Sequence, residues 1–112
     1  MKTNKVVTFG EIMVRLGAPD YLKLIQSNSL DVSYAGAEAN VAVSLAHYGI
    51  STDYITCLPE NPIAEHCIME LRGHRVGVDH IQRSGKRMGI LYLETGSNMR
   101  SSKVFYDREY SS

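Results

Sequence analysis

The sequence has too little of several features that mark large classes of protein. Its 12 acidic residues balance its 12 lysines and arginines, which leaves a formal net charge of +0. No long-range field therefore draws the chain to nucleic acid or to an anionic membrane surface. No hydrophobic run is long enough for a signal sequence or a membrane span. We therefore expect a cytoplasmic protein; binding of a small neutral or anionic ligand would need no such field.

Metal and disulfide chemistry also find little support. The two cysteines, Cys57 and Cys67, have neither the spacing of a CxxC pair nor a nearby histidine pattern. This argues against a zinc site and against a disulfide scaffold, so both are expected to be buried thiols. The four histidines show no metal-ligand spacing and no obvious acidic partner, and roles on the surface or in the polar stripe of a helix are expected for them; they are His47, His66, His74 and His80.

The length of 112 residues and the apolar share of 44% fit one globular domain. The last residues follow a strand-like run without a closing helix or strand. We therefore expect the chain to be a fragment of a larger domain.

Two kinds of strand are predicted. Residues 5–9 are β-branched and apolar, as in the buried first strand of an α/β sheet, and residues 53–58 predict a second central strand. Shorter, half-exposed strands are predicted where polarity alternates, with a turn at residues 96–98 before the last of them. They cover residues 12–16, 21–25, 30–34, 87–94 and 103–107.

Two helices are predicted between and after the central strands. From Glu38 the apolar residues recur at helical spacing, and Gly49 ends the helix; the buried face holds Ala39, Ala42, Val43 and Ala46. Asn61 and Pro62 suit the N-cap and first turn of a second helix that ends near Gly73. The order strand, helix, strand predicts a parallel sheet of the α/β class.

The start of the first helix is the most informative position. Gly36 and Ala37 place free backbone N–H groups and the positive end of the helix dipole beside an open crevice. Asn40 offers both a donor and an acceptor, as a sugar hydroxyl requires. An ordinary strand-to-helix turn is the alternative interpretation. The segment matches neither the phosphate-binding GxxxxGK[ST] loop nor the dinucleotide-binding GxGxxG motif.

Gly10-Glu11, together with residues 35–46 and Gly49, resembles the N-terminal signature of the ribokinase-like (PfkB) carbohydrate kinases. Ala35 stands where the family commonly has a first glycine. The resemblance implies the N-terminal part of a three-layer α/β/α domain with a small β-sheet lid, formed here near residues 12–34 and 87–107. In this family the lid often pairs with a second subunit, which implies a homodimer or higher oligomer. Arg15, in the first lid strand, is expected to face solvent.

Residues 87–94 and 102–108 look like the 2-keto-3-deoxygluconate kinase branch of the family. The sugar-acid pocket is then implied to be lined by Gly36, Ala37, Asn40, Tyr92, Tyr106 and Arg108. Strand alternation independently places Tyr106 and Arg108 on one face, and a guanidinium offers paired donors to a carboxylate. The alternative is that Tyr106 belongs partly to the core and that Arg108 is a solvated charge.

Phosphoryl transfer needs a base, charge stabilisation and a site for ATP with Mg²⁺. In the family these come from the C-terminal half, with a Gly-Ala-Gly-Asp segment that residues 1–112 lack. We therefore expect no catalytic residue, no metal site and no kinase activity in this chain alone. The intact kinase would use ATP and Mg²⁺ to phosphorylate the 6-hydroxyl of 2-keto-3-deoxygluconate. A related fructokinase or nucleoside kinase, and a non-catalytic sugar-binding or dimerisation module, are the alternatives.

Overall fold

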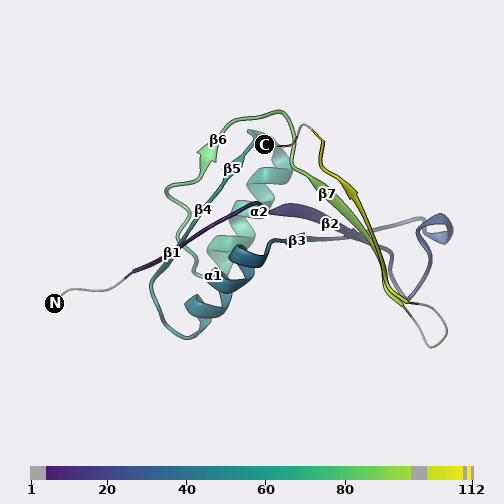
Figure 1. The fold of residues 1–112 in the computed structure, drawn as a ribbon, viewed down its shortest axis with the longest axis horizontal. Helices are drawn as coiled ribbons and strands as arrows, with labels where there is room; N and C mark the ends of the chain where they lie inside the picture. Colours follow the sequence, from purple (N-terminus) through teal and green to yellow (C-terminus); the bar gives the residue numbers. More distant parts are fainter. Residues whose placement is uncertain (1–4, 97–100, 110, 112) are drawn as a thin grey trace.

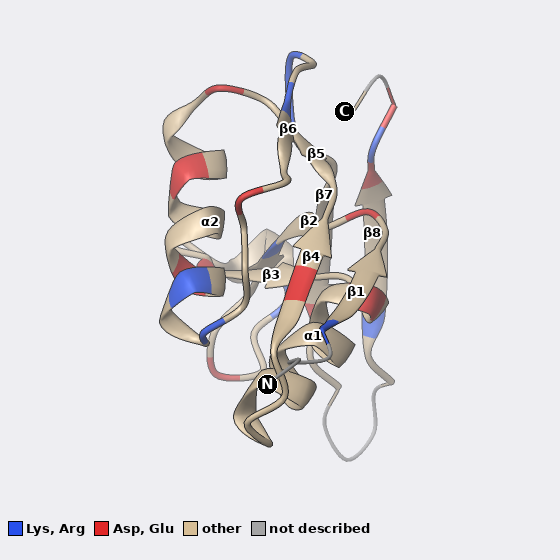
Figure 2. Ribbon diagram, turned by 90° about the vertical axis from the view of Figure 1, so that its left-hand side faces the viewer, with Lys and Arg blue, Asp and Glu red and all other residues tan. Residues whose placement is uncertain are grey.

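The computed structural model of the chain describes residues 5–96, 101–109 and 111. It consists of a body and an arm, with overall extents of 55 × 32 × 19 Å. The body holds both α-helices and a short parallel sheet, whereas a four-stranded sheet reaches away from them as the arm (Figure 1). Acidic and basic residues are interspersed along the ribbon (Figure 2). In the described part of the chain, no helix combines the length and apolarity needed to cross a membrane.

The body is built on the predicted strand, helix, strand unit. Strand β1 (Val6–Phe9) runs parallel to β4 (Thr52–Ile55), and α1 (Ala37–His47) packs against both. The single strand predicted over residues 53–58 is divided, since β4 is followed by β5 (Cys57–Leu58), which pairs with β6 (Gln82–Arg83). Between them the Thr56 carbonyl accepts from the Gln82 amide, so the chain changes its pairing partner there.

Helix α1 begins and ends at the kinds of residue that the sequence predicts. Gly36 is its N-cap and Glu38 lies in its first turn, where a carboxylate suits the positive end of the helix dipole. After the helix, Gly49 has a φ of 80°, a left-handed conformation that glycine adopts without strain. The Gly49 amide donates to the Ala46 carbonyl and closes the helix end.

Helix α2 (Pro62–Gly73) starts at an N-cap, Asn61, whose side chain accepts from the Ala64 amide at 2.8 Å. Its buried face joins the core that α1 forms with the body sheet. Cys67 lies in this core, and burial raises the pKa of its thiol to about 12. Cys57 is only half-buried, with its Sγ 3.0 Å from the Ser84 hydroxyl oxygen. The expectation of a buried thiol is therefore confirmed for Cys67 and wrong for Cys57.

The arm is a mixed sheet in the order β3-β2-β7-β8. Strands β2 and β7 are parallel, and the two outer strands are antiparallel to their neighbours. The bounds are β2 (Met13–Gly17), β3 (Asp31–Ala35), β7 (Ile90–Glu94) and β8 (Lys103–Asp107). The predicted turn at residues 96–98 lies largely outside the described residues.

The strand predicted over residues 21–25 is wrong. Asp20 and Tyr21 have φ values of 54° and 63°, so the backbone turns where a strand would have to run straight. A short 3-10 helix, η1 (Leu24–Gln26), follows this turn. The Leu24 amide donates to Glu94 Oε1 at 2.7 Å and ties the loop to β7. The strand predicted from residue 87 is also shorter than expected, since β7 begins at Ile90.

The open face of β1 is the largest departure from the sequence prediction for the body. Val7 and Phe9 are 54% and 73% exposed, although their strand reads as a buried one. Both point away from Thr8, whose cross-strand partner Tyr54 is fully buried in the core. The described residues therefore bury only one face of this strand.

Tyr54 joins the core to the end of β1, which gives a first prediction. Its hydroxyl donates to the Gly10 carbonyl at 2.7 Å, and burial raises its pKa to about 12, so it remains a donor at neutral pH. Tyr54→Phe should lower the free energy of unfolding in urea by about 1 kcal/mol, because the partly buried Gly10 carbonyl loses its donor. Tyr48→Phe is the matched control, since Tyr48 is 83% exposed. Equal stability of the two variants would contradict this role for Tyr54.

Candidate functional site

The turn between β3 and α1 lies against the backbone that follows β1. A Cβ atom on Gly36 would lie 2.6 Å from the Glu11 carbonyl oxygen and 3.3 Å from the Ile12 Cα. Neither atom belongs to a side chain that could move aside. Gly36 is therefore the residue that lets the start of α1 approach residues 11 and 12 this closely.

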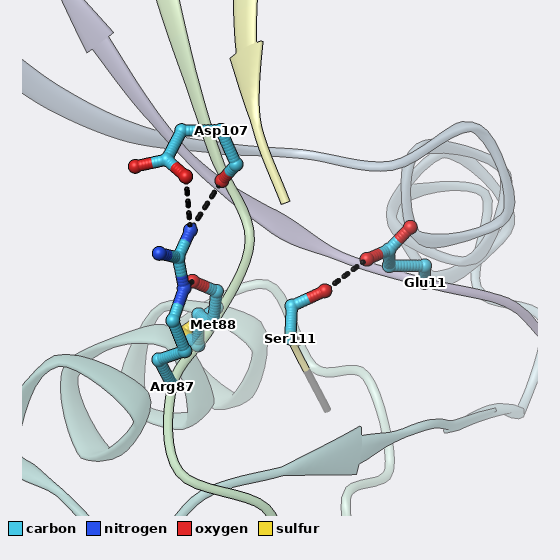
Figure 3. Close-up of polar contacts among 5 residues, drawn as sticks. All are labelled: Glu11, Arg87, Met88, Asp107 and Ser111. Atoms are coloured by element: carbon cyan, nitrogen blue, oxygen red, sulfur yellow. Dashed lines mark hydrogen bonds and ion pairs between the residues drawn. The ribbon is translucent and has the colours of Figure 1, made fainter. Parts of the chain in front are cut away.

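Glu11 links this turn to the end of the arm. Its carboxylate accepts from the Arg108 guanidinium. It also accepts from the Ser111 hydroxyl at 3.3 Å (Figure 3). At Gly89 an added Cβ would lie 3.2 Å from the Arg108 Cβ and 3.3 Å from Glu11 Oε2, so a larger residue would crowd the pair. We call Glu11, Gly36, Gly89 and Arg108 the junction cluster.

Tyr106 lies beside Arg108, as strand alternation predicted. The central carbon of the Arg108 guanidinium is 5.9 Å from the centre of the Tyr106 ring, within the range of a cation–π contact. The Arg108 side chain is 53% exposed, so part of its guanidinium is open to solvent. A phenol and a guanidinium therefore stand together next to the Glu11 carboxylate.

Tyr92 is not brought to this group. In the arm sheet Tyr92 pairs with Phe105, whereas Tyr106 pairs with Leu91. Because successive side chains alternate between faces, Tyr92 and Tyr106 point to opposite faces of the sheet. Tyr92 instead lines a hollow with Leu24 and residues 27–30. Its predicted contact with a sugar acid stays a prediction and gains no support from the position of Arg108.

Ala37 and Asn40 lie in the first turn of α1, next to Gly36 in the chain, and both are exposed. Asn40 lines a hollow of about 240 Å³ between β3, α1 and α2. Polar groups of that hollow include Tyr34 and Glu70. The four residues of the junction cluster do not line this hollow, whose wall Asn40 shares with residues of β3 and α2.

Tyr34 and His66 form a polar link across that wall. The Tyr34 hydroxyl lies 2.7 Å from His66 Nδ1, and His66 Nε2 lies 3.6 Å from Glu70 Oε1. Burial raises the pKa of Tyr34 to about 12, so it stays a neutral phenol. The expectation that the histidines lack an acidic partner is wrong for His66. His66 and Glu70 lie one helical turn apart in α2, at spacing i, i+4, which can be read from the sequence.

Two arginines hydrogen-bond to neighbouring parts of the chain. Arg15 Nε donates to the Ser33 hydroxyl at 2.8 Å, so Arg15 is held against the neighbouring strand. Arg87 donates to Met88 and to the Asp107 carboxylate, the latter at 2.9 Å (Figure 3). These contacts depend on strand register, which the sequence pattern did not specify.

The arrangement supplies cationic and neutral donors to a small polar ligand. The Arg108 guanidinium can hold a carboxylate through charge-assisted hydrogen bonds, and the start of α1 favours negative charge. Within residues 5–96, 101–109 and 111, no three His, Cys, Asp or Glu side chains gather as metal ligands. The donors of the described site are of the kind that suits an anionic ligand.

A second prediction concerns Gly36. Gly36→Ala should lower the free energy of unfolding by about 1–3 kcal/mol, because the new methyl group overlaps backbone atoms of residues 11 and 12. Gly17→Ala, in β2, is the matched control, since nothing lies within 4 Å of a Cβ there. Denaturant unfolding of both variants tests this. A Gly36→Ala protein as stable as the Gly17→Ala protein would refute the close approach.

The profile of the pfkB family carbohydrate kinases matches residues 3–112. A curated relative, the 2-dehydro-3-deoxygalactonokinase of Haloferax volcanii, is 39% identical over 108 residues, which are 95% of this chain and 33% of that protein. The 2-dehydro-3-deoxygluconokinase of Bacillus subtilis is 32% identical over 70% of this chain and 24% of its own length.

The crystal structure of a 2-dehydro-3-deoxygluconokinase from Thermotoga maritima superposes with a TM-score of 0.93. The two sequences are 50% identical, and the match covers 96% of this chain and 33% of the Thermotoga maritima chain. The predicted ribokinase-like α/β fold is thus confirmed, and the chain spans about a third of the length of the first of these curated relatives. By its profile match and its fold, the chain belongs to the pfkB family of carbohydrate kinases.

Proposed function

We propose that residues 1–112 are the sugar-binding part of an ATP-dependent kinase. The whole enzyme transfers the γ-phosphate of ATP to the 6-hydroxyl of 2-keto-3-deoxygluconate. The observation that carries this proposal is that Arg108, beside Tyr106, already holds a carboxylate, that of Glu11. Support comes from the 50% identity to a Thermotoga maritima protein named for the same sugar acid.

Recognition of the acid group rests on Arg108. A guanidinium has five N–H donors in a fixed fork. It can bind a substrate carboxylate through the donors that Glu11 does not use, or it can release Glu11 and bind the substrate carboxylate instead. Tyr106 limits the movement of the guanidinium on one side. A neutral sugar would gain none of this charge-assisted bonding.

The rest of the sugar is bound by the start of α1 and by the arm. Gly36 and Ala37 offer backbone N–H groups, and Asn40 offers an amide that can both donate to and accept from a hydroxyl. Tyr92 would contact the ligand only from the other face of the arm sheet, so we place it in the outer part of the pocket. The arm acts as the lid, and a second subunit packs on it to form a homodimer.

The catalytic groups belong to the remainder of the kinase. ATP and its Mg²⁺, together with the base that accepts the hydroxyl proton, are supplied by a part of the protein beyond this chain. The chain alone therefore binds the sugar acid without turning it over. The enzyme acts in the cytoplasm, where ATP is available.

A second candidate substrate is the C4 epimer, 2-keto-3-deoxygalactonate. It is favoured by the 39% identity to the Haloferax volcanii protein named for it. Both acids present the same carboxylate to Arg108, so the junction cluster does not discriminate between them. The neutral substrate of a fructokinase or nucleoside kinase would have no carboxylate for Arg108 to bind. A non-catalytic binding or dimerisation module would bind the acid and never phosphorylate it.

The activity is tested in a chimera in which residues 1–112 replace the matching third of the Thermotoga maritima enzyme. We expect ATP-dependent phosphorylation of 2-keto-3-deoxygluconate by the chimera and none by the 112-residue chain. Activity on the epimer and on fructose is measured in parallel. Turnover by the isolated chain, or a folded chimera that phosphorylates only neutral sugars, would overturn the proposal.

The role of Arg108 is tested in the same chimera. Arg108→Ala should raise KM for the sugar acid about 10- to 100-fold, because a hydrogen bond to a charged group contributes about 1.5–3 kcal/mol. KM for a neutral sugar should change little. Arg87→Ala is the matched control, since it removes a guanidinium that holds Asp107 in the same sheet. A loss that is equal for acidic and neutral sugars would make Arg108 a structural residue.

Glu11 gives a prediction with the opposite sign. Its carboxylate occupies the guanidinium that the substrate needs, so Glu11→Gln should tighten binding of the sugar acid and leave neutral sugars unchanged. Isothermal titration of the chimera measures the change. Weaker binding of the acid by Glu11→Gln would show that Glu11 positions Arg108 and does not compete with the ligand.

A further inference from the structure

The C-terminal ends of the two α-helices meet at a pair of histidines. His47 is the last residue of α1, and His74 is the C-cap of α2. His47 Nε2 lies 3.1 Å from His74 Nδ1, and the ring centroids are 5.2 Å apart with the planes tilted by 45°. Both residues are exposed, so the pair is accessible to solvent. With one ring donating and the other accepting, the contact is a hydrogen bond between imidazoles.

The separation of these two nitrogens also suits a shared metal ion. With metal–nitrogen bonds of 2.0–2.1 Å, two nitrogens 3.1 Å apart subtend an angle of about 98° at the metal. That angle lies between the values for neighbouring octahedral and tetrahedral ligands. A small rotation of each ring would aim both lone pairs at one ion, and it requires no movement of the backbone.

Some charges around His47 and His74 favour binding of a cation, and others oppose it. The negative ends of two helix dipoles point to this place and favour a cation. Arg75 lines the same open hollow as both histidines and opposes one. Glu70, which lines the adjoining hollow with His74, is already paired with His66. Arg72, in the last turn of α2, adds a second exposed positive charge nearby. The helix ends and the imidazoles therefore have to outweigh two exposed guanidinium groups, which solvent screens.

We propose that His47 and His74 bind a divalent transition-metal ion of the kind that prefers imidazole, such as Cu²⁺, Ni²⁺ or Zn²⁺. No third His, Cys, Asp or Glu of the described residues completes the set, so water fills the remaining positions. Such an open site exchanges its ion and does not bind Mg²⁺, which prefers oxygen ligands. This inference is independent of the sugar site and of the proposed kinase activity.

The bound ion would clasp the two helices at one end. Any ligand that binds only the folded state stabilises it by mass action. The opposite end of α1 carries Gly36 and Asn40, so the clasp fixes the helix whose first turn forms the candidate sugar site. Metal binding would therefore raise the melting temperature of the chain.

The test uses the 112-residue chain without an affinity tag, titrated with CuCl₂, NiCl₂ and MgCl₂. Calorimetry should show one site, with tighter binding of Cu²⁺ than of Ni²⁺ and none of Mg²⁺. His47→Gln and His74→Gln should each weaken metal binding by at least roughly 10- to 100-fold. Loss of a residue that only hydrogen-bonds a metal ligand already costs that much, and each of these variants removes a ligand itself. His80→Gln is the matched control and should bind as the unchanged chain does.

Arg75→Gln provides a variant whose expected effect has the opposite sign. Removing its positive charge should tighten metal binding without adding a ligand. Circular dichroism in EDTA checks that each variant folds as the parent chain does. The proposal is overturned if the parent chain binds no Cu²⁺ or Ni²⁺ at millimolar concentration, or if His47→Gln and His80→Gln lose the same affinity.

Discussion

The close approach of Gly36 to the backbone after β1 is the constraint on which the junction of body and arm depends. Because Gly36 has no side chain, the start of α1 approaches residues 11 and 12, which connect β1 to β2, more closely than a Cβ atom would allow. Tyr54 secures the same segment from the core by donating to the Gly10 carbonyl. The backbone of Glu11 is held in this packed segment, and the Glu11 carboxylate reaches Arg108, just beyond the end of β8.

This rigid segment explains why Arg108 stands where it does. An arginine just past the end of an edge strand would ordinarily turn toward water, and such an exposed charge contributes little to stability. Here Glu11, Tyr106 and the space left by Gly89 hold it against the body. In the proposed kinase, the Glu11 carboxylate would occupy the place on Arg108 that the carboxylate of the substrate takes. Specificity in such a site depends on the difference between two carboxylates competing for one guanidinium.

The two faces of β1 differ because the described part of the chain supplies helices to only one of them. Tyr54 and the alanines of α1 form a close-packed core on that face, whereas Val7 and Phe9 remain open on the other. An α/β sheet normally covers both faces with helices. The relatives are about three times as long as this chain. In the proposed whole kinase, further helices would cover the open face.

Local patterns in the sequence were sufficient for much of the fold. The spacing of Ala39, Ala42 and Ala46, the Asn61 cap and the stop at Gly49 set both helices, because these signals act within one or two turns. The alternation in residues 103–107 likewise placed Tyr106 and Arg108 on one side. Over residues 20–25 the same kind of pattern failed, since positive φ values turn the chain and a hydrogen bond to Glu94, distant in sequence, holds the result.

By itself, the sequence determined both helices and, through its resemblance to sugar-acid kinases, indicated which residues to expect at the site: a small-residue helix start, an arginine and two tyrosines. Only the tertiary structure decided which of them meet. Strand register put Tyr92 on the opposite face from Tyr106, and long-range packing brought Glu11 to Arg108 and His47 to His74. Register and packing depend on contacts between residues far apart in the chain, and a local pattern carries no record of them.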